Sequence, residues 1–319
     1  MLAEYFTKVI LKGNNFPFLL KIILLLIVFK RNILSKKYGN FKNYENIEKN
    51  IKYNINKEAF DFSKRKNGIS LFARLKNSAD LLEIAIESHI DFYDEIILVD
   101  NNSIDNTREI CKKMRYKYPD KIKYYEYNEE VVTYGAPNRN KIPENSVHSM
   151  VYYYNWTLSK TTYKYVAKLD DDIVVMDKKL IKEKTNYIRK NGINYLQIIP
   201  QINVHISKGK LVTPLKGPTS NILPLIAGIY CDHGIFPISE NTYFIKGPQV
   251  ESFIFPFRYR ISNLGFFHLK GLKKKLGAFN QKGEVARIIM DINDNSTYIP
   301  LPEEYKTQLA KWVDIKGYQ

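Results

Sequence analysis

The amino-acid sequence predicts an α/β protein with a mixed, mostly parallel sheet flanked by helices. From Gly68 onward, short apolar runs alternate with amphipathic stretches of helical period, the pattern of strand–helix–strand units. The runs at 95–100 and 163–169 are apolar and lead into aspartates, as expected for buried strands whose carboxyl ends face a ligand. The 319 residues, 45% of them hydrophobic, are enough to bury a sizeable core.

Strand and helix signals alternate through the first half of this region. The strand at 95–100 is the clearest, because an apolar run of this length suits burial on both faces. The expected elements are a strand at 69–74, a helix after a cap at Asn77 or Ser78, the strand at 95–100, a helix between Asn106 and Pro119 with Glu109 completing a capping box, a strand at 122–127, a loop at 129–145 and a helix over about 146–159.

The second half is less regular. A strand at 163–169, a helix from Asp177 to Gly192 and a strand at 195–199 are followed by a Gly/Pro-punctuated region that we expect to be irregular to about Pro256. A strand at 264–270 and a C-terminal helix complete the chain. Three segments follow: 1–67, an apolar, basic segment and linker; 68–200, the regular α/β half; and 201–319, a less regular half that ends in the helix.

The N-terminal segment is apolar and basic. Residues 16–29 would form a helix of about 21 Å at 1.5 Å per residue, shorter than the roughly 20 apolar residues that span a bilayer. No small-residue cleavage site follows it. Residues 1–68 hold 14 Lys/Arg and 5 Asp/Glu, and so 9 of the 16 net positive charges. We expect this helix to lie on an anionic membrane surface, the alternative being a core or oligomer helix. Residues 38–67 are expected to be a linker or a peripheral helix.

Three consecutive carboxylates follow the strand at 163–169. If the extended backbone continues, Asp170 and Asp172 point the same way, because side chains alternate along a strand. Two converging carboxylates at a strand end suit a hard divalent cation that a diphosphate also binds. The alternative is a solvated acidic turn.

Asp100 ends the strand at 95–100 and should lie at the same sheet edge as Asp170. A carboxylate there can accept hydrogen bonds from a base or ribose. The sequence has no Gly-x-Gly-x-x-Gly after its first strand and no Gly-x-x-x-x-Gly-Lys-Ser/Thr, so dinucleotide and P-loop sites are disfavoured. The two cysteines have no metal-binding or disulfide spacing.

These motifs, in this order, resemble a family 2-type glycosyltransferase of the GT-A fold. The resemblance rests on Phe-Ala-Arg-Leu-Lys-Asn at 72–77, the Val-Asp-x-x-Ser-x-Asp-x-Thr block at 99–107, and Lys-Leu-Asp-Asp-Asp at 168–172. It covers about residues 68–190, and it implies a nucleotide-sugar-binding half at 68–200 and an acceptor-binding half at 201–319. It implies a nucleotide-sugar donor, with a UDP-sugar expected, and Mn²⁺ or Mg²⁺.

The resemblance assigns roles to individual positions. Asp100 would contact the nucleotide, with Asn101 where several members have a second Asp, and Arg74 would meet the nucleotide at the end of the first strand. Asp170 and Asp172 would hold the metal, and Asp171 would complete the donor-binding triplet.

Family members often add a C-terminal histidine to the metal shell, and His268 matches by position and context. Imidazole suits Mn²⁺ better than Mg²⁺. Lys270, on the same face of its strand, could neutralise the diphosphate. The lysines at 273–275 are expected to form a solvated basic face.

Inverting transfer, which the resemblance implies, needs a carboxylate base on the acceptor side. Asp232 and Glu251 are the candidates, each near Gly/Pro turns, with a slight preference for Glu251.

The sequence therefore predicts a metal-dependent glycosyltransferase that moves a sugar onto a cell-surface glycan or lipid-linked acceptor. We expect it at the cytoplasmic face of a membrane, the bacterial inner membrane, with no nucleic-acid partner. The alternatives are a nucleotidyltransferase on a similar sheet and a non-catalytic basic protein that binds membrane or nucleic acid. A nucleic-acid binder should carry its charge with aromatic residues along one face, whereas here the charge gathers at the apolar N-terminus.

Overall fold

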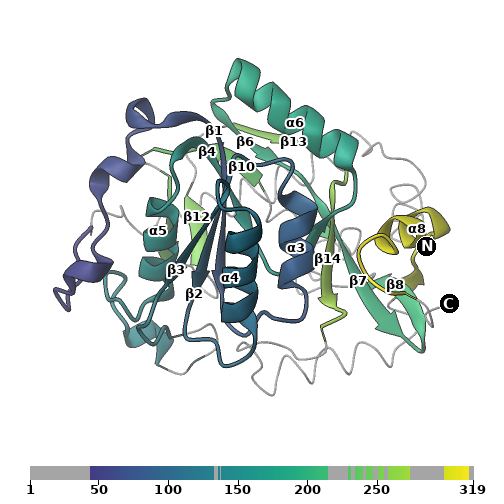
Figure 1. Ribbon diagram of the computed structural model, residues 1–319, viewed down its shortest axis with the longest axis horizontal. Coiled ribbons are helices and arrows are strands. Elements are labelled where there is room, and N and C mark those ends of the chain that lie inside the picture. The colour runs from purple at the N-terminus through teal and green to yellow at the C-terminus, as the bar shows by residue number, and fades with distance from the viewer. Residues whose placement is uncertain are drawn as a thin grey trace.

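The computed structural model describes residues 44–132, 136, 138–214, 229–230, 234–239, 242–246, 251–254, 258–273 and 298–315. The predicted helix at 16–29 lies outside these residues. The centre of the molecule is a seven-stranded sheet in the order β13-β6-β10-β4-β1-β2-β3 (Figure 1). Its strands are β1 (Lys66–Leu75), β2 (Glu95–Asp100), β3 (Ile122–Glu126), β4 (Tyr163–Leu169), β6 (Tyr195–Ile198), β10 (Gly234–Pro237) and β13 (Arg258–Ile261).

Most neighbours in this sheet run parallel. β1 pairs in parallel with both β2 and β4, β2 with β3, and β6 with β13, whereas β10 is antiparallel to β4 and β6. The predicted mixed, mostly parallel α/β sheet is confirmed. Strands from both sides of residue 200 contribute to it.

Helices cover both faces of this sheet (Figure 1). Leu71 and Ala73 of β1 share a buried cluster with residues of α3 (Leu82–His89), α4 (Thr107–Lys117) and α6 (Lys178–Asn191). Phe72, between them in sequence, points to the opposite face and packs with α5 (Met150–Ser159). This alternation is the signature of a strand that is buried on both sides.

Residues 44–64 pack against the body of the protein, so of the two predicted alternatives, a linker and a peripheral helix, the linker is wrong for this part. They form three short 3-10 helices, Ile51–Tyr53, Lys57–Phe60 and Phe62–Lys64. Tyr53, Ile55 and Phe60 are buried in the same cluster as α5. The Glu48 carboxylate accepts hydrogen bonds from the Ser146 hydroxyl and from the Val147 amide. Burial of these side chains and the hydrogen bonds to Glu48 therefore hold this segment in place.

The described residues between Pro200 and Pro256 lie mostly in strands, so the expectation of an irregular region is wrong for them, and several of these strands belong to a second sheet. The sheet has the order β15-β8-β7-β14-β5, with β9 paired to β7. Its strands are β5 (Ile173–Val175), β7 (Gln201–Ser207), β8 (Lys210–Pro214), β9 (Ile229–Tyr230), β14 (Phe266–Gly271) and β15 (Tyr298–Pro300). A separate hairpin joins β11 (Tyr243–Lys246) to β12 (Glu251–Ile254), and α8 (Glu303–Leu309) is the predicted C-terminal helix.

Helix starts follow the sequence in part. Asp177 caps α6 as predicted, accepting a 2.9 Å hydrogen bond from the Leu180 amide, and Gly192 follows the helix with a φ of +68°. α4 begins after Asn106 as predicted, but the Asn106 side chain makes no capping hydrogen bond, and Asp105 accepts from the Thr107 amide instead. Within the described part of the chain, no helix is long and apolar enough to cross a membrane.

Candidate active site

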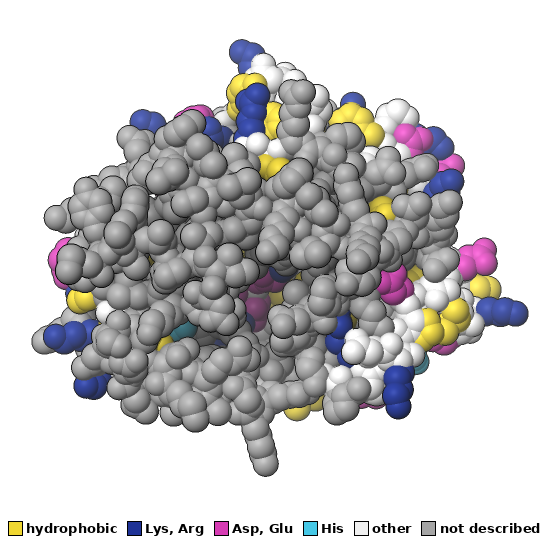
Figure 2. Space-filling model, turned by 180° about the vertical axis from the view of Figure 1, so that it is seen from behind, with side chains coloured by type: hydrophobic (Ala, Val, Ile, Leu, Met, Phe, Trp, Pro, Cys, Tyr) yellow, Lys and Arg dark blue, Asp and Glu magenta, His cyan; other side chains and the backbone are white. Residues whose placement is uncertain are grey.

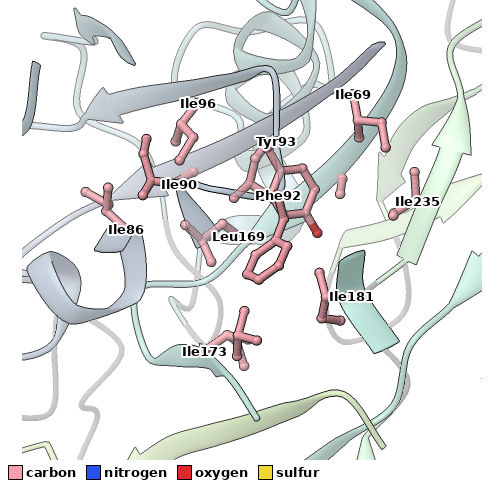
Figure 3. Close-up of a cluster of buried hydrophobic side chains, with 14 of the residues drawn as sticks. Ile69, Ile86, Ile90, Phe92, Tyr93, Ile96, Leu169, Ile173, Ile181 and Ile235 are labelled. Atoms are coloured by element: carbon pink, nitrogen blue, oxygen red, sulfur yellow. The ribbon is translucent and has the colours of Figure 1, made fainter. Parts of the chain in front are cut away.

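The acidic triplet forms a turn between the two sheets. The Ile173 amide donates to the Asp170 carbonyl at 3.2 Å, which closes the chain between β4 and β5. Leu169 and Ile173 on either side are 1% exposed and point into the buried cluster shown in Figure 3. Because residues 170–172 form a turn, the strand alternation used to pair Asp170 with Asp172 does not apply. Apolar anchors on both sides therefore fix the turn.

Strand pairing brings His268 to Asp172. β14 runs antiparallel to β5 with His268 opposite Ile173, and the Leu269 amide donates to the Asp172 carbonyl at 2.7 Å. The His268 Nε2 atom lies 3.4 Å from Asp172 Oδ1. Both side chains are largely buried, at 15% and 5% exposure. The structure therefore places together two of the three predicted metal ligands.

Asn203 orients the His268 ring. In the parallel pairing of β7 with β14, Asn203 lies directly beside His268, and the Asn203 Oδ1 atom is 2.7 Å from His268 Nδ1. Asn203 Oδ1 accepts from a proton on Nδ1, so a neutral His268 ring would present its Nε2 lone pair to a cation held between it and Asp172. Metal-ligating histidines in general are held by such a hydrogen bond on their second nitrogen.

Lys273 is the buried counter-ion of the triplet, so the expected solvated basic face is wrong for this residue. Its Nζ atom lies 2.9 Å from Asp171 Oδ1 and 2.9 Å from Asp172 Oδ2, and its side chain is 14% exposed. Burial raises the pKa of Asp171 to about 6, although the Lys273 ammonium opposes this rise. Burial also acts to raise the pKa of Asp172, but His268 and Lys273 outweigh it and hold that pKa well below its usual range.

Asp170 faces another partner. Its Oδ2 atom lies 2.9 Å from the Lys168 ammonium, and its side chain is 39% exposed. The structure thus groups Asp171 and Asp172 around Lys273 and leaves Asp170 on a more exposed side of the turn. The predicted role of Asp170 as a metal ligand stays a prediction.

The sheet register places Asp100 at the same edge as the triplet. β1 lies between β2 and β4, with Leu75 opposite Asp100 on one side and Ala73 opposite Leu169 on the other. Two inter-strand spacings separate β2 from β4, or about 10 Å. Asp100 is fully buried, and Arg108 Nη2 lies 3.4 Å from its Oδ2 atom. Asp100 Oδ1 accepts no hydrogen bond from any described residue.

Two loops at this edge are joined by hydrogen bonds. The Ser78 amide donates to Thr107 Oγ1 at 2.6 Å, and the Asn77 amide donates to Ser103 Oγ at 2.9 Å. The Ser78 side chain also hydrogen-bonds Asp171. The loop after β1 therefore connects the Asp100 loop to the acidic turn.

Two further predicted residues, Arg74 and Asn101, are described by their own contacts. Arg74 stacks on Tyr154, with its Cζ atom 3.1 Å from the ring centroid, and its Nε atom has no hydrogen-bond partner among the described residues. Asn101 is buried and donates to the carbonyls of Tyr127 and Glu129 at 2.8 and 2.7 Å, a structural use of its amide.

The last three predicted residues, Lys270, Glu251 and Asp232, are described by the structure only in part or not at all. The Lys270 backbone lies in β14, and the Glu251 backbone lies in β12, paired with Lys246. The side chains of Lys270 and Glu251, and all of Asp232, lie outside the described part of the molecule.

Asp172 and His268 have the chemistry of divalent-cation ligands. Across the described ranges, no three His, Cys, Asp or Glu residues converge as a complete metal cage. A catalytic Mg²⁺ or Mn²⁺ needs fewer protein ligands, because substrate phosphates and water fill its other positions. Asp172 with the oriented His268 supplies one carboxylate and one imidazole, a donor set that Mn²⁺ accepts better than Mg²⁺.

Three residues of this centre were not identified from the sequence: Asn203, Lys273 and Arg108. Asn203 and Lys273 act through strand pairings and a turn that join distant parts of the chain, so no local pattern marks them. Arg108 directly follows the Val-Asp-x-x-Ser-x-Asp-x-Thr block and is the second residue of α4, and this position is the one sequence signal that marks it.

The fold and this acidic, polar edge define a ligand-binding α/β protein with the site at the carboxyl ends of its strands. Residues 72–140 match the family model described as glycosyl transferase family 2. This region includes the end of β1, all of β2 and Asp100, and over these residues the match confirms the resemblance to family 2-type glycosyltransferases inferred from the motifs.

No curated protein is significantly similar to the chain. Among solved structures, a mycobacterial protein is 12% identical with a TM-score of 0.32, over 57% of this chain and 56% of that one. Glucosyl-3-phosphoglycerate synthase from Mycobacterium tuberculosis, in a complex with Mn²⁺, UDP-glucose and phosphoglyceric acid, is 15% identical with a TM-score of 0.26, over 46% and 47% of the two chains. The chain thus spans about half the length of these structures.

Proposed function

We propose that this protein transfers a sugar from a nucleotide-sugar donor with the help of Mn²⁺ or Mg²⁺. The observation that supports this most strongly is the 3.4 Å approach of His268 Nε2 to Asp172 Oδ1. The pair lies at the edge of the sheet where β2 ends in the buried Asp100. A cation site and a nucleotide-binding carboxylate at one edge are what a nucleotide-sugar enzyme requires.

Each residue then has a distinct task. Asp172 and His268 would hold the cation, and Asn203 would keep the imidazole in the orientation that ligation needs. When bound, the cation neutralises the charge that develops on the departing nucleoside diphosphate. Asp100 would accept hydrogen bonds from the nucleoside through Oδ1, since a buried acceptor without a partner costs about 1–3 kcal/mol.

A UDP-sugar is the proposed donor, and a glycan or glycolipid is the proposed acceptor. Transfer would invert the anomeric centre, with Glu251 or Asp232 removing the proton of the acceptor hydroxyl as the sugar–phosphate bond breaks. Arg74, at the end of β1, would lie along the nucleotide.

We also propose that the enzyme works at a membrane surface, the cytoplasmic face of a bacterial inner membrane. The apolar 16–29 segment and the excess of basic residues before Gly68 support this. Such a segment would hold the active site close to a lipid-linked acceptor.

The decisive assay measures the release of nucleoside diphosphate from UDP-sugars with Mn²⁺, with and without a chelator. We expect activity that the chelator removes and that Asp172→Ala lowers by about 100-fold or more, because a direct ligand is lost. Asp120→Ala, on the exposed turn after α4, is the control and should retain full activity. Transfer that is indifferent to chelator and to Asp172→Ala would overturn the metal assignment.

A further inference from the structure

Lys273 occupies the position between two carboxylates where a cation would bind. Its ammonium lies 2.9 Å from an oxygen of Asp171 and 2.9 Å from an oxygen of Asp172, and Asp172 also faces His268. The lysine is the second residue after β14, and the Leu272 amide before it donates to the Leu269 carbonyl at 2.8 Å, which turns the chain toward the triplet. One strand and the turn after it therefore deliver both the imidazole and the ammonium to Asp172.

We propose that Lys273 is a resident counter-ion that competes with the divalent cation for Asp172 and thereby sets the affinity of the metal site. This inference rests on the metal site of the proposed function. The ammonium neutralises the buried carboxylates before the cation arrives, and the cation displaces it from Asp172. Asp171 retains it after the exchange, so the displaced charge stays beside the site instead of leaving it.

The physical basis is the cost of bringing two cations together in a buried place. A divalent ion on Asp172 would lie within a few ångströms of the ammonium, and like charges repel strongly where water is scarce. Carboxylates that are buried without any counter-ion are also strongly destabilising. A lysine at this point therefore stabilises the metal-free protein and weakens metal binding.

A second lysine, Lys168, also pairs with an aspartate of the triplet, but in a more exposed place. Lys168 pairs with Asp170, which is 39% exposed, whereas Asp172 beside Lys273 is 5% exposed. Water screens the first pair more than the second. Competition with the cation should therefore act mainly through Lys273.

The test is a titration of the purified full chain with Mn²⁺ alone, without donor, following free Mn²⁺ by electron paramagnetic resonance. Lys273→Met should bind Mn²⁺ about tenfold more tightly or better, because the competing charge is gone. Lys273→Arg keeps the charge and should stay near wild type. Lys306→Met is the matched control, a lysine that is 15% exposed and pairs with Glu303, and it should also stay near wild type.

Thermal unfolding gives a second readout. In chelator, Lys273→Met should melt below wild type, and saturating Mn²⁺ should raise its melting temperature by more than it raises that of wild type. If Lys273→Met does not fold, Asp171→Asn is compared with Asp171→Asn/Lys273→Met, which removes one charge of each sign. The double variant should bind Mn²⁺ more tightly than the single one.

The outcomes separate this inference from the proposed function. Mn²⁺ binding by wild type with equal or weaker binding by Lys273→Met would overturn the competition and leave the metal site standing. Absence of Mn²⁺ binding from wild type and every variant would overturn the metal site and, with it, this inference.

Discussion

His268 Nε2 and Asp172 Oδ1 lie 3.4 Å apart although 95 positions separate the two residues in sequence. The antiparallel pairing of β14 with β5 produces this approach, because it sets Leu269 beside Asp172 and His268 beside Ile173. The triplet leaves the seven-stranded sheet at the end of β4 and enters the second sheet at β5. The candidate metal site therefore lies at the junction of the two sheets, and its geometry depends on both.

Asn203 should control metal affinity without touching the metal. Replacing it by leucine of similar size removes the acceptor of the His268 Nδ1 proton, and we expect Mn²⁺ affinity to fall by about 10–100-fold. Asn203→Asp keeps an acceptor in the same place and should restore most of the affinity. Mn²⁺ titration of the three proteins checks this, and equal affinities would show that the hydrogen bond does not orient the ligand.

Asp100 should control nucleotide affinity. Asp100→Asn keeps the shape but replaces an acceptor oxygen by a donor, so the affinity for UDP should fall by about tenfold, or 1.4 kcal/mol. Calorimetric titration with UDP and Mn²⁺ measures this change. Glu126→Gln is the control, because Glu126 also lies near Arg108, with its Oε1 atom 3.7 Å from Nε, but is 38% exposed. A matching loss in both variants would indicate that the effect passes through Arg108.

His89 should make the fold sensitive to acid. Burial lowers the pKa of this histidine to about 4, although its hydrogen bond to the Ala85 carbonyl opposes the change. The folded protein then binds the proton less readily than the unfolded chain, whose histidine has a pKa of about 6.5. Stability is therefore complete above about pH 6.5 and is lost as the pH falls toward 4.

The size of the effect follows from that difference in pKa. At pH 5 the penalty is about 2 kcal/mol relative to pH 8. His89→Phe, which keeps an aromatic ring stacked on Phe266, should lose less stability between pH 8 and pH 5 than wild type. Denaturant unfolding at the two pH values measures this. An unchanged pH dependence in His89→Phe would assign the acid sensitivity to other groups.

The N-terminal segment should determine membrane binding and leave the donor site intact. Without residues 1–37, the protein should no longer sediment with vesicles that contain anionic lipid, and should bind UDP with Mn²⁺ as the full chain does. Neutral vesicles serve as the control, because the basic residues require negative headgroups. Continued sedimentation of the shortened protein would place the lipid-binding surface elsewhere.

Much of the central sheet could be predicted from the sequence, because its signals are local. The run at 95–100 is apolar throughout and ends in Asp100, and the structure has β2 over these same residues. Asp177 and Gly192 bound α6 as cap and stop. The sequence signals of buried parallel strands and capped helices lie within a few consecutive residues, which is why the sequence predicts these elements.

The second sheet and the counter-ion could not be predicted in the same way. β7 and β8 form a local hairpin, but β7 also pairs with β14 and β8 with β15, which are partners far away in sequence, so the stretch after Pro200 shows no regular period. Lys273 begins a run of three lysines, a pattern typical of a solvated face, and only its position after β14 makes it the partner of Asp171 and Asp172. Asp170 was paired with Asp172 by strand alternation, which the turn at 170–172 removes.

The most direct test of the proposed function is the anomalous diffraction of Mn²⁺ in crystals grown with UDP. We expect one Mn²⁺ peak at coordination distance from both an Asp172 carboxylate oxygen and His268 Nε2, bridged to the diphosphate, with the nucleoside against Asp100. A Mn²⁺ and UDP site that contacts neither Asp172 nor His268 would contradict the proposed function at its centre.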